Sequence, residues 1–139
     1  MTLTQLVYAS RSRLVEAERS VEIPRILASA QRLNELNGIT GFLLVTPGGF
    51  AQILEGEGDS VVETYGRIMA DPRHGDLRLL QQATAIERRF AGWTMGMAER
   101  DPTTEFIFGL YGISADADIF DQQLDTIVDL AGQLAAHPA

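Results

Sequence analysis

The chain has 139 residues, of which 45% are hydrophobic, which suits one domain with a buried core. It contains no cysteine, and all eleven basic residues are arginine. This composition excludes disulfides, thiolate nucleophiles, zinc–sulfur sites and the lysine of a Schiff base or a phosphate-binding loop. The net charge is −8, and residues 99–139 carry one arginine against eight acidic residues. We therefore expect no nucleic-acid partner, because nucleic-acid binding needs a basic surface.

No apolar run approaches the ~20 residues that span a bilayer, and the amino terminus lacks the pattern of a secretory signal. We therefore expect a cytoplasmic protein without a membrane partner. Residues 3–10, LTQLVYAS, alternate as a strand. Pro24 fits the first turn of a helix that follows an arginine-rich loop, and Asn37-Gly38 ends that helix. Two strands over 39–46 and 50–55 follow, joined by a Pro-Gly-Gly turn.

Ser60-x-x-Glu63 has the form of a capping box, and the helix that it would open ends at Asp71-Pro72. Two further strands are expected near 78–86 and 93–98. The resulting order, βαββαββ, predicts an α+β fold of ferredoxin-like type with both helices on one face of the sheet. The acidic stretch EGEGD at 55–59 is better explained as a turn before the second helix than as a metal site, and we expect no metal.

The strand over 39–46 is apolar on both faces, so something must cover the second face. Apolar residues from 120 to 134 repeat at helical spacing, and FIFGLYG (106–112) leads into them. We therefore predict a C-terminal helical cap on the face opposite the two helices. We divide the chain into a domain over 1–98 and a helical extension over 99–139 that packs on it.

Polar side chains stand at positions that the pattern predicts to be buried. Gln52 lies in the middle of the third strand, Tyr8 lies in the first, and Asn34 lies on the buried stripe of the first helix. Trp93 and Met95, two residues apart, should share a face of the last strand. Each could be a polar residue satisfied within the core. Together they are better explained by one shared planar ligand rich in donors and acceptors.

These residues belong to motifs that resemble the BLUF domains, a family of flavin-binding blue-light sensors. The matching segments are Tyr8-Ala9-Ser10, Asn34 followed by NGITG (37–41), FAQILEG around Gln52, RIMADPRH (67–74) and RRFAGWTMGM (88–97). They occur in the family's order and spacing over about residues 3–98. Leu33 departs from the family, which often has a polar residue before the flavin-contacting asparagine.

The resemblance implies a non-covalently bound FAD whose ring lies between the two helices, over the sheet. Tyr8 and Gln52 would be the photoactive pair, and Trp93 and Met95 would relay the signal. The implied cofactor contacts are Tyr8, Ile26, Asn34, Gln52, Arg67, Ile68, Asp71, Arg73 and His74. A surface role for Arg67, Arg73 and His74 stays open. Light would drive electron and proton transfer along Tyr8, Gln52 and the flavin, and a hydrogen-bond rearrangement would give a red-shifted state.

The implied output is a change in the last strand and the C-terminal helix that alters contacts with an unidentified downstream protein or within a homo-oligomer. We therefore expect a sensor and not an enzyme. An alternative is a small flavin-dependent oxidoreductase, or a hydrolase of the same fold, for which His74 is the plausible acid or base. A flavin-free interaction module is the third possibility.

Overall fold

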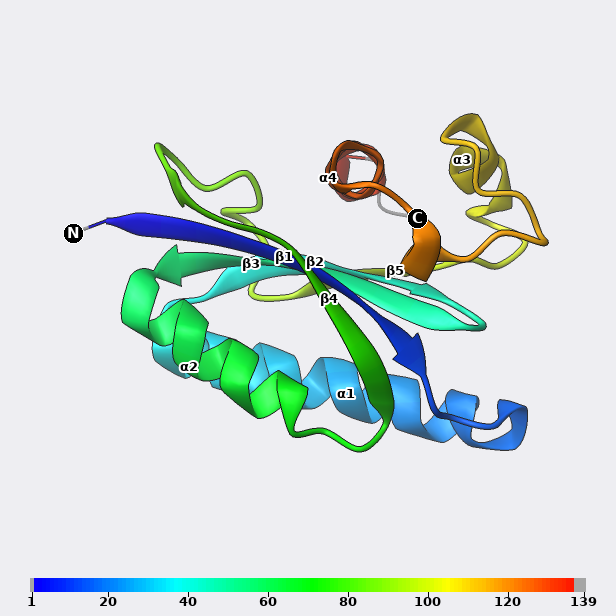
Figure 1. Cartoon of the computed structure of the whole chain (residues 1–139), viewed down its shortest axis with the longest axis horizontal. Helices are drawn as coiled ribbons and strands as arrows, with labels where there is room; N and C mark the ends of the chain where they lie inside the picture. The colour runs from blue at the N-terminus through cyan, green and yellow to red at the C-terminus, as the bar shows by residue number, and fades with distance from the viewer. Residues whose placement is uncertain (1, 137–139) are drawn as a thin grey trace.

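The computed structural model describes residues 2–136, and it contains a five-stranded sheet with the strand order β4-β1-β3-β2-β5 (Figure 1). The strands are β1 (Leu3–Ser12), β2 (Thr40–Thr46), β3 (Gly49–Glu57), β4 (His74–Ala85) and β5 (Gly96–Glu99). All neighbouring strands are antiparallel except β2 and β5, which are parallel. β3 is thereby inserted beside β1, which is the arrangement expected of a split βαβ fold.

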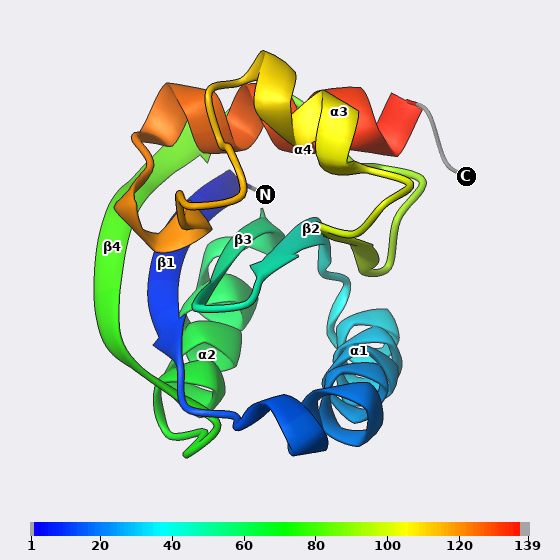
Figure 2. The same cartoon turned by 90° about the vertical axis from the view of Figure 1, so that its right-hand side faces the viewer.

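The helices lie on both faces of this sheet (Figures 1 and 2). α1 (Glu16–Asn37) and α2 (Gly58–Met69) cover one face, and α3 (Glu105–Leu110), the short 3₁₀ helix η1 (Ile119–Asp121) and α4 (Leu124–Ala136) cover the other. The predicted α+β class, the βαββαββ order and the helical cap on the opposite face are confirmed. Within residues 2–136, no helix is long and apolar enough to cross a membrane.

The start of α1 was predicted wrongly, because Pro24 lies inside the helix and not in its first turn. The helix begins at Glu16, where the Glu18 side chain accepts a hydrogen bond of 3.1 Å from the Val15 amide. Pro24 removes one backbone hydrogen bond, but the apolar stripe that α1 packs on the sheet continues through it. The predicted end is correct, since Gly38 takes a left-handed conformation with φ 68°.

The predicted capping box is also wrong, because α2 starts at Gly58 and Ser60 lies within it. Glu57 caps the helix, and its carboxylate accepts from the Asp59 amide at 3.4 Å. A carboxylate suits the positive end of the helix dipole, and Glu57 belongs to the acidic stretch 55–59 that was expected to precede this helix. At the other end of the chain, Phe120 lies in η1, and α4 starts only at Leu124.

The sheet separates two apolar clusters, as the two-sided pattern of the second strand predicted. Phe42 and Leu44 join the cluster beneath α3, η1 and α4, whereas Leu43 and Val45 join the cluster beneath α1 and α2. We refer to these as the cap face and the helix face of the sheet. Both faces of β2 are therefore buried, and each is covered by its own set of helices.

Trp93 and Met95 do not share a face of a strand, contrary to the prediction. β5 begins only at Gly96, so both residues lie in the irregular segment that precedes it. Met95 is buried in the cluster of the helix face, whereas Trp93 packs against the cluster of the cap face and makes an edge contact with Phe42. The alternation rule failed here because it applies only to extended backbone.

Candidate functional site

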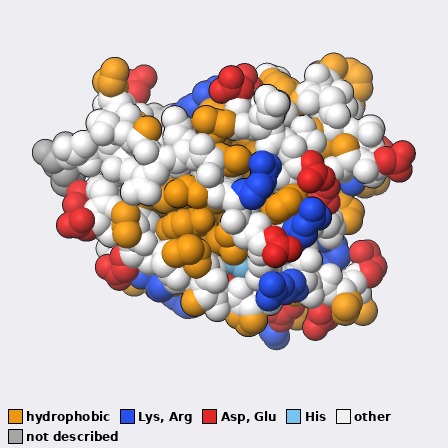
Figure 3. Space-filling view, in the orientation of Figure 1, with side chains coloured by type: hydrophobic (Ala, Val, Ile, Leu, Met, Phe, Trp, Pro, Cys, Tyr) orange, Lys and Arg blue, Asp and Glu red, His pale blue; other side chains and the backbone are white. Residues whose placement is uncertain are grey.

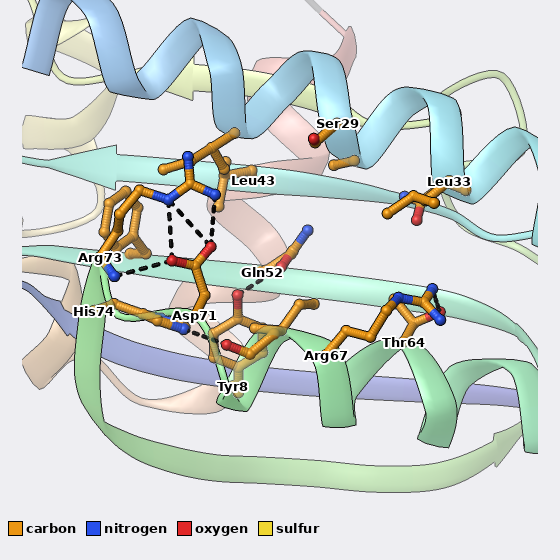
Figure 4. Close-up of a pocket in the computed structure, with 15 residues that line it drawn as sticks. Tyr8, Ser29, Leu33, Leu43, Gln52, Thr64, Arg67, Asp71, Arg73 and His74 are labelled. Atoms are coloured by element: carbon orange, nitrogen blue, oxygen red, sulfur yellow. Dashed lines mark hydrogen bonds and ion pairs between the residues drawn. The ribbon is translucent and has the colours of Figure 1, made fainter.

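A cavity of about 210 Å³ lies on the helix face, bounded by α1, α2 and the sheet (Figure 4). The nine residues that the resemblance nominated as cofactor contacts all line it: Tyr8, Ile26, Asn34, Gln52, Arg67, Ile68, Asp71, Arg73 and His74. They come from β1, α1, β3, α2 and the segment from α2 into β4. The fold therefore brings together residues that are spread over sixty-seven positions of the sequence, from 8 to 74.

Tyr8 and Gln52 form the floor of this cavity (Figure 4). They lie directly opposite each other in the antiparallel pairing of β1 with β3. The Tyr8 hydroxyl donates a hydrogen bond of 2.6 Å to Gln52 Oε1, and both side chains are buried. Gln52 is thus not an unpaired polar group in the core. Its cost of burial, about 1–3 kcal/mol if left unpaired, is offset by a partner on the neighbouring strand.

The other end of the Gln52 amide reaches the segment that precedes β5. Gln52 Nε2 donates to the sulfur of Met95 at 3.4 Å. The backbone of that segment is held from α1, since Asn34 Nδ2 donates to the Thr94 carbonyl at 2.8 Å and Gln31 Nε2 donates to the Met95 carbonyl at 3.1 Å. One buried amide therefore connects a phenol on β1 with the segment that leads into β5.

The environment of Tyr8 keeps its phenol protonated. Burial raises the pKa of Tyr8 far above its ordinary value, and the neighbouring Tyr65 and Asp71 raise it further. The Tyr65 ring packs against the Tyr8 ring, with centroids 5.4 Å apart. Because the hydroxyl retains its proton, it serves as the donor in the bond to Gln52, and the amide oxygen is the acceptor.

The rim of the cavity is formed by an ion pair at the end of α2. Arg73 donates to both carboxylate oxygens of Asp71, at 3.0 Å from Nε and 2.7 Å from a terminal nitrogen, and reaches Glu22 at 3.4 Å. These bonds hold the pKa of Asp71 below its ordinary value. Arg67 lies at the rim too, where it donates to Thr64 Oγ1 at 3.3 Å and pairs with the exposed Glu63, an ion pair that contributes little to stability.

His74 is part of the wall of the cavity. Its ring nitrogens lie 2.7 Å from Ser10 Oγ and 2.6 Å from the Ile68 carbonyl oxygen. A carbonyl only accepts, so the nitrogen that faces it, Nε2, carries a proton. The His74 ring thus joins β1 to the end of α2.

Within residues 2–136, no group of three or more His, Asp or Glu side chains is arranged so that it could hold a metal ion.

Several residues that line or support this cavity were not predicted from the sequence. Ser29 and Thr64 line it, and each lies on the same helical stripe as a predicted neighbour: Ser29 three residues after Ile26, and Thr64 four residues before Ile68. Helical spacing alone could have found both. Gln31 and Glu55 do not line the cavity. They were missed because they bond to backbone groups distant in the sequence: Gln31 donates to the Met95 carbonyl, and the buried carboxylate of Glu55 accepts from the amides of residues 89 and 90.

Fold and site together define a class of protein: a ferredoxin-like domain with a ligand cavity between its helices and a phenol–amide pair on the cavity floor. The family model described as BLUF, sensors of blue light using FAD, matches residues 3–96. The chain therefore belongs to the BLUF family, and its members bind flavin.

Curated relatives agree with this assignment. The chain is 37% identical over 106 residues to the photoactivated adenylate cyclase subunit beta of Euglena gracilis, and 34% identical over 111 residues to the blue light- and temperature-regulated antirepressor BluF of Escherichia coli. These alignments cover 76% of this chain but only 12% and 27% of the relatives. The relatives are thus several times longer than the part that this chain matches.

Solved structures of the family match nearly the whole chain. The ground state of BlsA superposes with a TM-score of 0.83 at 26% identity over 96% of this chain and 87% of that chain. The dark state of the BLUF protein BlrB superposes with a TM-score of 0.79 at 29% identity over 97% and 96%. The similarity therefore extends through the helical cap, beyond the residues that the family model matches.

The cavity fits a flavin by the chemistry of its lining. Aliphatic side chains of α1 and α2, Ile26 and Ile68, supply apolar walls for a flat ring. Asn34 uses its amide nitrogen on the Thr94 carbonyl, which leaves its oxygen as an acceptor for a ring N–H. The arginines at the rim, Arg67 and Arg73, suit the polar and anionic chain that a flavin nucleotide carries.

Proposed function

We propose that this chain is a blue-light photoreceptor that binds FAD non-covalently and uses Tyr8 and Gln52 as its photoactive pair. The observation that carries the proposal is the 2.6 Å hydrogen bond between these two side chains, on the floor of a cavity lined by all nine residues that the family resemblance nominated as cofactor contacts. Family membership supports light sensing and flavin binding, and the geometry supports the assignment of the two residues.

The walls and the rim would hold the cofactor in different ways. Ile26 and Ile68 would pack on the two faces of the ring and exclude water, and Asn34 would fix the ring edge by one hydrogen bond. Arg67 would exchange the exposed Glu63 for a phosphate, because an exposed ion pair is worth about 0–1 kcal/mol and a phosphate is a stronger acceptor. The family model describes sensors that use FAD, and this supports FAD over FMN as the cofactor.

A bound flavin supplies absorption of blue light and, once excited, an acceptor for one electron. Tyr8, on the cavity floor, would be the electron donor, and its proton is already directed at Gln52 Oε1. Loss of an electron makes a phenol strongly acidic, so the proton can move along this existing 2.6 Å bond to the amide. The return of electron and proton restores the phenol, so the cycle ends with no net oxidation and a changed hydrogen-bond pattern.

Gln52 is the group whose hydrogen bonds would differ between the dark state and the red-shifted state. In the structure its oxygen faces a donor, Tyr8, and its nitrogen faces a weak acceptor, the Met95 sulfur. The two ends of an amide have nearly the same shape and opposite hydrogen-bonding sense, so rotation or tautomerisation alters every partner without repacking. A stronger hydrogen bond to a flavin carbonyl would produce the red shift.

The signal would leave through the segment 93–95. Met95 contacts Gln52 on the helix face, and Trp93 contacts the cluster of the cap face, so this segment passes from one face of the sheet to the other. Release of Met95 would therefore be felt by β5 and by the extension after residue 98. We propose that this extension, which packs on the domain over 1–98, is the surface that contacts a downstream protein.

An absorption spectrum of the purified, FAD-loaded protein before and after blue light tests this proposal. A reversible red shift is expected for the wild type, and none for Tyr8→Phe, which lacks both the electron-donating phenol and its proton. Tyr65→Phe is the matched control, since Tyr65 packs on Tyr8 without bonding to Gln52, and it should retain the shift. A normal photocycle in Tyr8→Phe would contradict the assignment of Tyr8.

A further inference from the structure

Two amide side chains of α1 hold the backbone of the segment 93–95, which precedes β5. Asn34 Nδ2 donates to the Thr94 carbonyl at 2.8 Å, and Gln31 Nε2 donates to the Met95 carbonyl at 3.1 Å. The two donors stand three residues apart and therefore share one face of the helix. Successive carbonyls of a regular strand point to opposite sides, so two bonds from one helix to adjacent carbonyls fit only an irregular segment.

The side chain of Met95 is confined between this backbone and the sheet. It is buried, and a Cβ placed on Gly41 of β2 would lie only 3.3 Å from its methyl carbon. The Met95 sulfur accepts the bond of 3.4 Å from Gln52 Nε2. Sulfur is a weak acceptor, so this bond does little to hold the methionine by itself. The position of the Met95 backbone therefore decides whether the sulfur lies within reach of the amide.

One of the two amides of α1 belongs to the cavity and the other does not. Asn34 lines the cavity, so its position depends on what the cavity holds, whereas Gln31 lies outside the lining and is exposed. We propose that Gln31 is a positioning residue for the photoactive pair. Its bond to the Met95 carbonyl keeps the sulfur against Gln52 Nε2 and thereby sets the lifetime of the red-shifted state. The statement about the lifetime rests on the proposed function, and the statement about Met95 does not.

The direction of the effect follows from the role of the sulfur. The bond from Gln52 Nε2 to Met95 belongs to the structure to which the protein returns in the dark. A Met95 that is no longer held makes this bond less favourable, so the return is slower. Loss of the Gln31 bond should slow dark recovery by no more than loss of the sulfur itself, about two- to fivefold. The size of the red shift should stay the same, because Gln31 lies outside the cavity.

Variants of Gln31 test this role through the kinetics of dark recovery in the FAD-loaded protein. Gln31→Leu removes the donor and should slow recovery by about twofold or more, whereas Gln31→Lys keeps an N–H donor and should recover like the wild type. Glu35→Leu, at an exposed position one turn further along α1, is the matched control and should also recover like the wild type. Wild-type recovery in Gln31→Leu, or equal slowing in the leucine and lysine variants, would overturn the proposal.

The combination with Met95→Leu distinguishes positioning of the sulfur from a general effect on the helix. If Gln31 acts through the sulfur, Gln31→Leu should slow recovery no further once Met95→Leu has removed that sulfur. The double variant should then recover at the rate of Met95→Leu alone. Slowing by the product of the two single effects would show that Gln31 acts by another route, and the proposal would be wrong.

The methionine methyl groups report on the position of Met95 without any photochemistry. Hydrophobic side chains gather at the surface over α2 and β4 (Figure 3), and Met69 at the end of α2 is half exposed, whereas Met95 is buried. In methyl NMR spectra of the purified protein in the dark, Gln31→Leu should shift or broaden the Met95 signal and leave the Met69 signal unchanged. An unchanged Met95 signal would refute the positioning role. A wild type without a red shift would instead refute the proposed function, and the methyl spectrum would still decide whether Gln31 positions Met95.

Discussion

The two faces of this sheet are built from the same strands yet are filled in different ways. On the cap face, apolar side chains from β1, β2, β3 and α4 pack together, and Leu130, Ala131 and Ile127 are fully buried. An open hollow of about 520 Å³ lies at the margin of this face, between α4 and residues 89–93, but apolar side chains fill the space over the sheet. On the helix face, α1 and α2 stand apart over a cavity of about 210 Å³. Buried polar side chains, among them Asn34, Gln52, Thr64 and His74, line that cavity.

This difference indicates which face carries stability and which carries function. A filled apolar face gains about 25 cal/mol per Å² buried, and it tolerates no polar group without a partner. A hollow face gives up part of this gain and must satisfy its polar groups pairwise, as Tyr8 and Gln52 do. The cap face therefore supports the rigid sheet on which the polar pair of the helix face is positioned.

The largest expected effect comes from Gln52→Leu, which should abolish the red-shifted state while the protein still folds. Leucine fills the volume of the amide but cannot exchange donor for acceptor. It also leaves the buried Tyr8 hydroxyl without an acceptor, at a cost of about 1–3 kcal/mol. Absorption difference spectra measure the photocycle, and denaturant unfolding measures the stability.

The double variant Tyr8→Phe/Gln52→Leu separates the two consequences of that change. Removing both partners of a buried hydrogen bond is nearly neutral, so the double variant should recover most of the stability that Gln52→Leu loses. It should still show no red shift. A double variant as unstable as the sum of the single variants would mean that the two side chains act independently.

The second prediction places the stability on the opposite face. Leu130→Ala on α4 should lower the free energy of unfolding by about 2–5 kcal/mol, since the residue is fully buried and the filled core cannot collapse around the deletion. The position of the light-induced red shift should stay the same, because Leu130 lies across the sheet from the cavity. Leu36→Ala, on an exposed position of α1, is the control and should cost little. An altered shift in Leu130→Ala would contradict this separation.

The sequence predicted what depends on local pattern and residue chemistry. The structure confirms the predicted order of elements and the two buried faces of β2, which follow from the apolar patterns of the sequence. It also confirms that Tyr8 faces Gln52, which follows from a fold that places β3 beside β1. The nine nominated residues do line one cavity. That they contact a cofactor stays a prediction that the spectra and variants above test.

The sequence failed where a competing local signal or a long-range contact decided the structure. Pro24 and Ser60 have the chemistry of helix starts, but each helix begins earlier, where the carboxylate of Glu18 or of Glu57 accepts from a backbone amide. Trp93 and Met95 have strand-like spacing, but the buried Glu55 carboxylate holds the amides of Arg89 and Phe90 and keeps the preceding segment irregular. No local pattern can reveal such a bond, because its partners lie more than thirty residues apart.

A smaller effect is expected from Met95→Leu, which tests the connection between the two faces. Leucine keeps the packing but removes the sulfur that accepts from Gln52 Nε2. When the Gln52 amide returns to its dark orientation, it would then lack a hydrogen bond worth about 0.5–1 kcal/mol. Dark recovery should therefore slow by about two- to fivefold, with the red shift retained. Met97→Leu, in the same cluster without a bond to Gln52, should recover like the wild type. Equal recovery in both variants would contradict a role for the sulfur.

The smallest effect concerns the ion pair at the cavity rim. Because Arg73 lowers the pKa of Asp71 in the folded protein, the pair stabilises the fold above the ordinary carboxyl pKa of 3.8 and loses this contribution as the pH falls through the lowered value. Asp71→Asn should therefore cost about 1 kcal/mol or less near neutral pH, and wild type and variant should converge at strongly acidic pH. Thermal unfolding as a function of pH measures the convergence.

The matched control lies on the other face, where Asp129 of α4 faces Arg89 at 3.5 Å with both side chains about half exposed. Asp129→Asn should change the melting temperature less than Asp71→Asn, because a loose exposed pair contributes little at any pH. The loss of stability at acidic pH would then arise mainly from the ion pair on the helix face. If Asp129→Asn proved the more costly change, polar contacts would matter as much to the cap face as to the cavity, and the division of roles between the two faces would not hold.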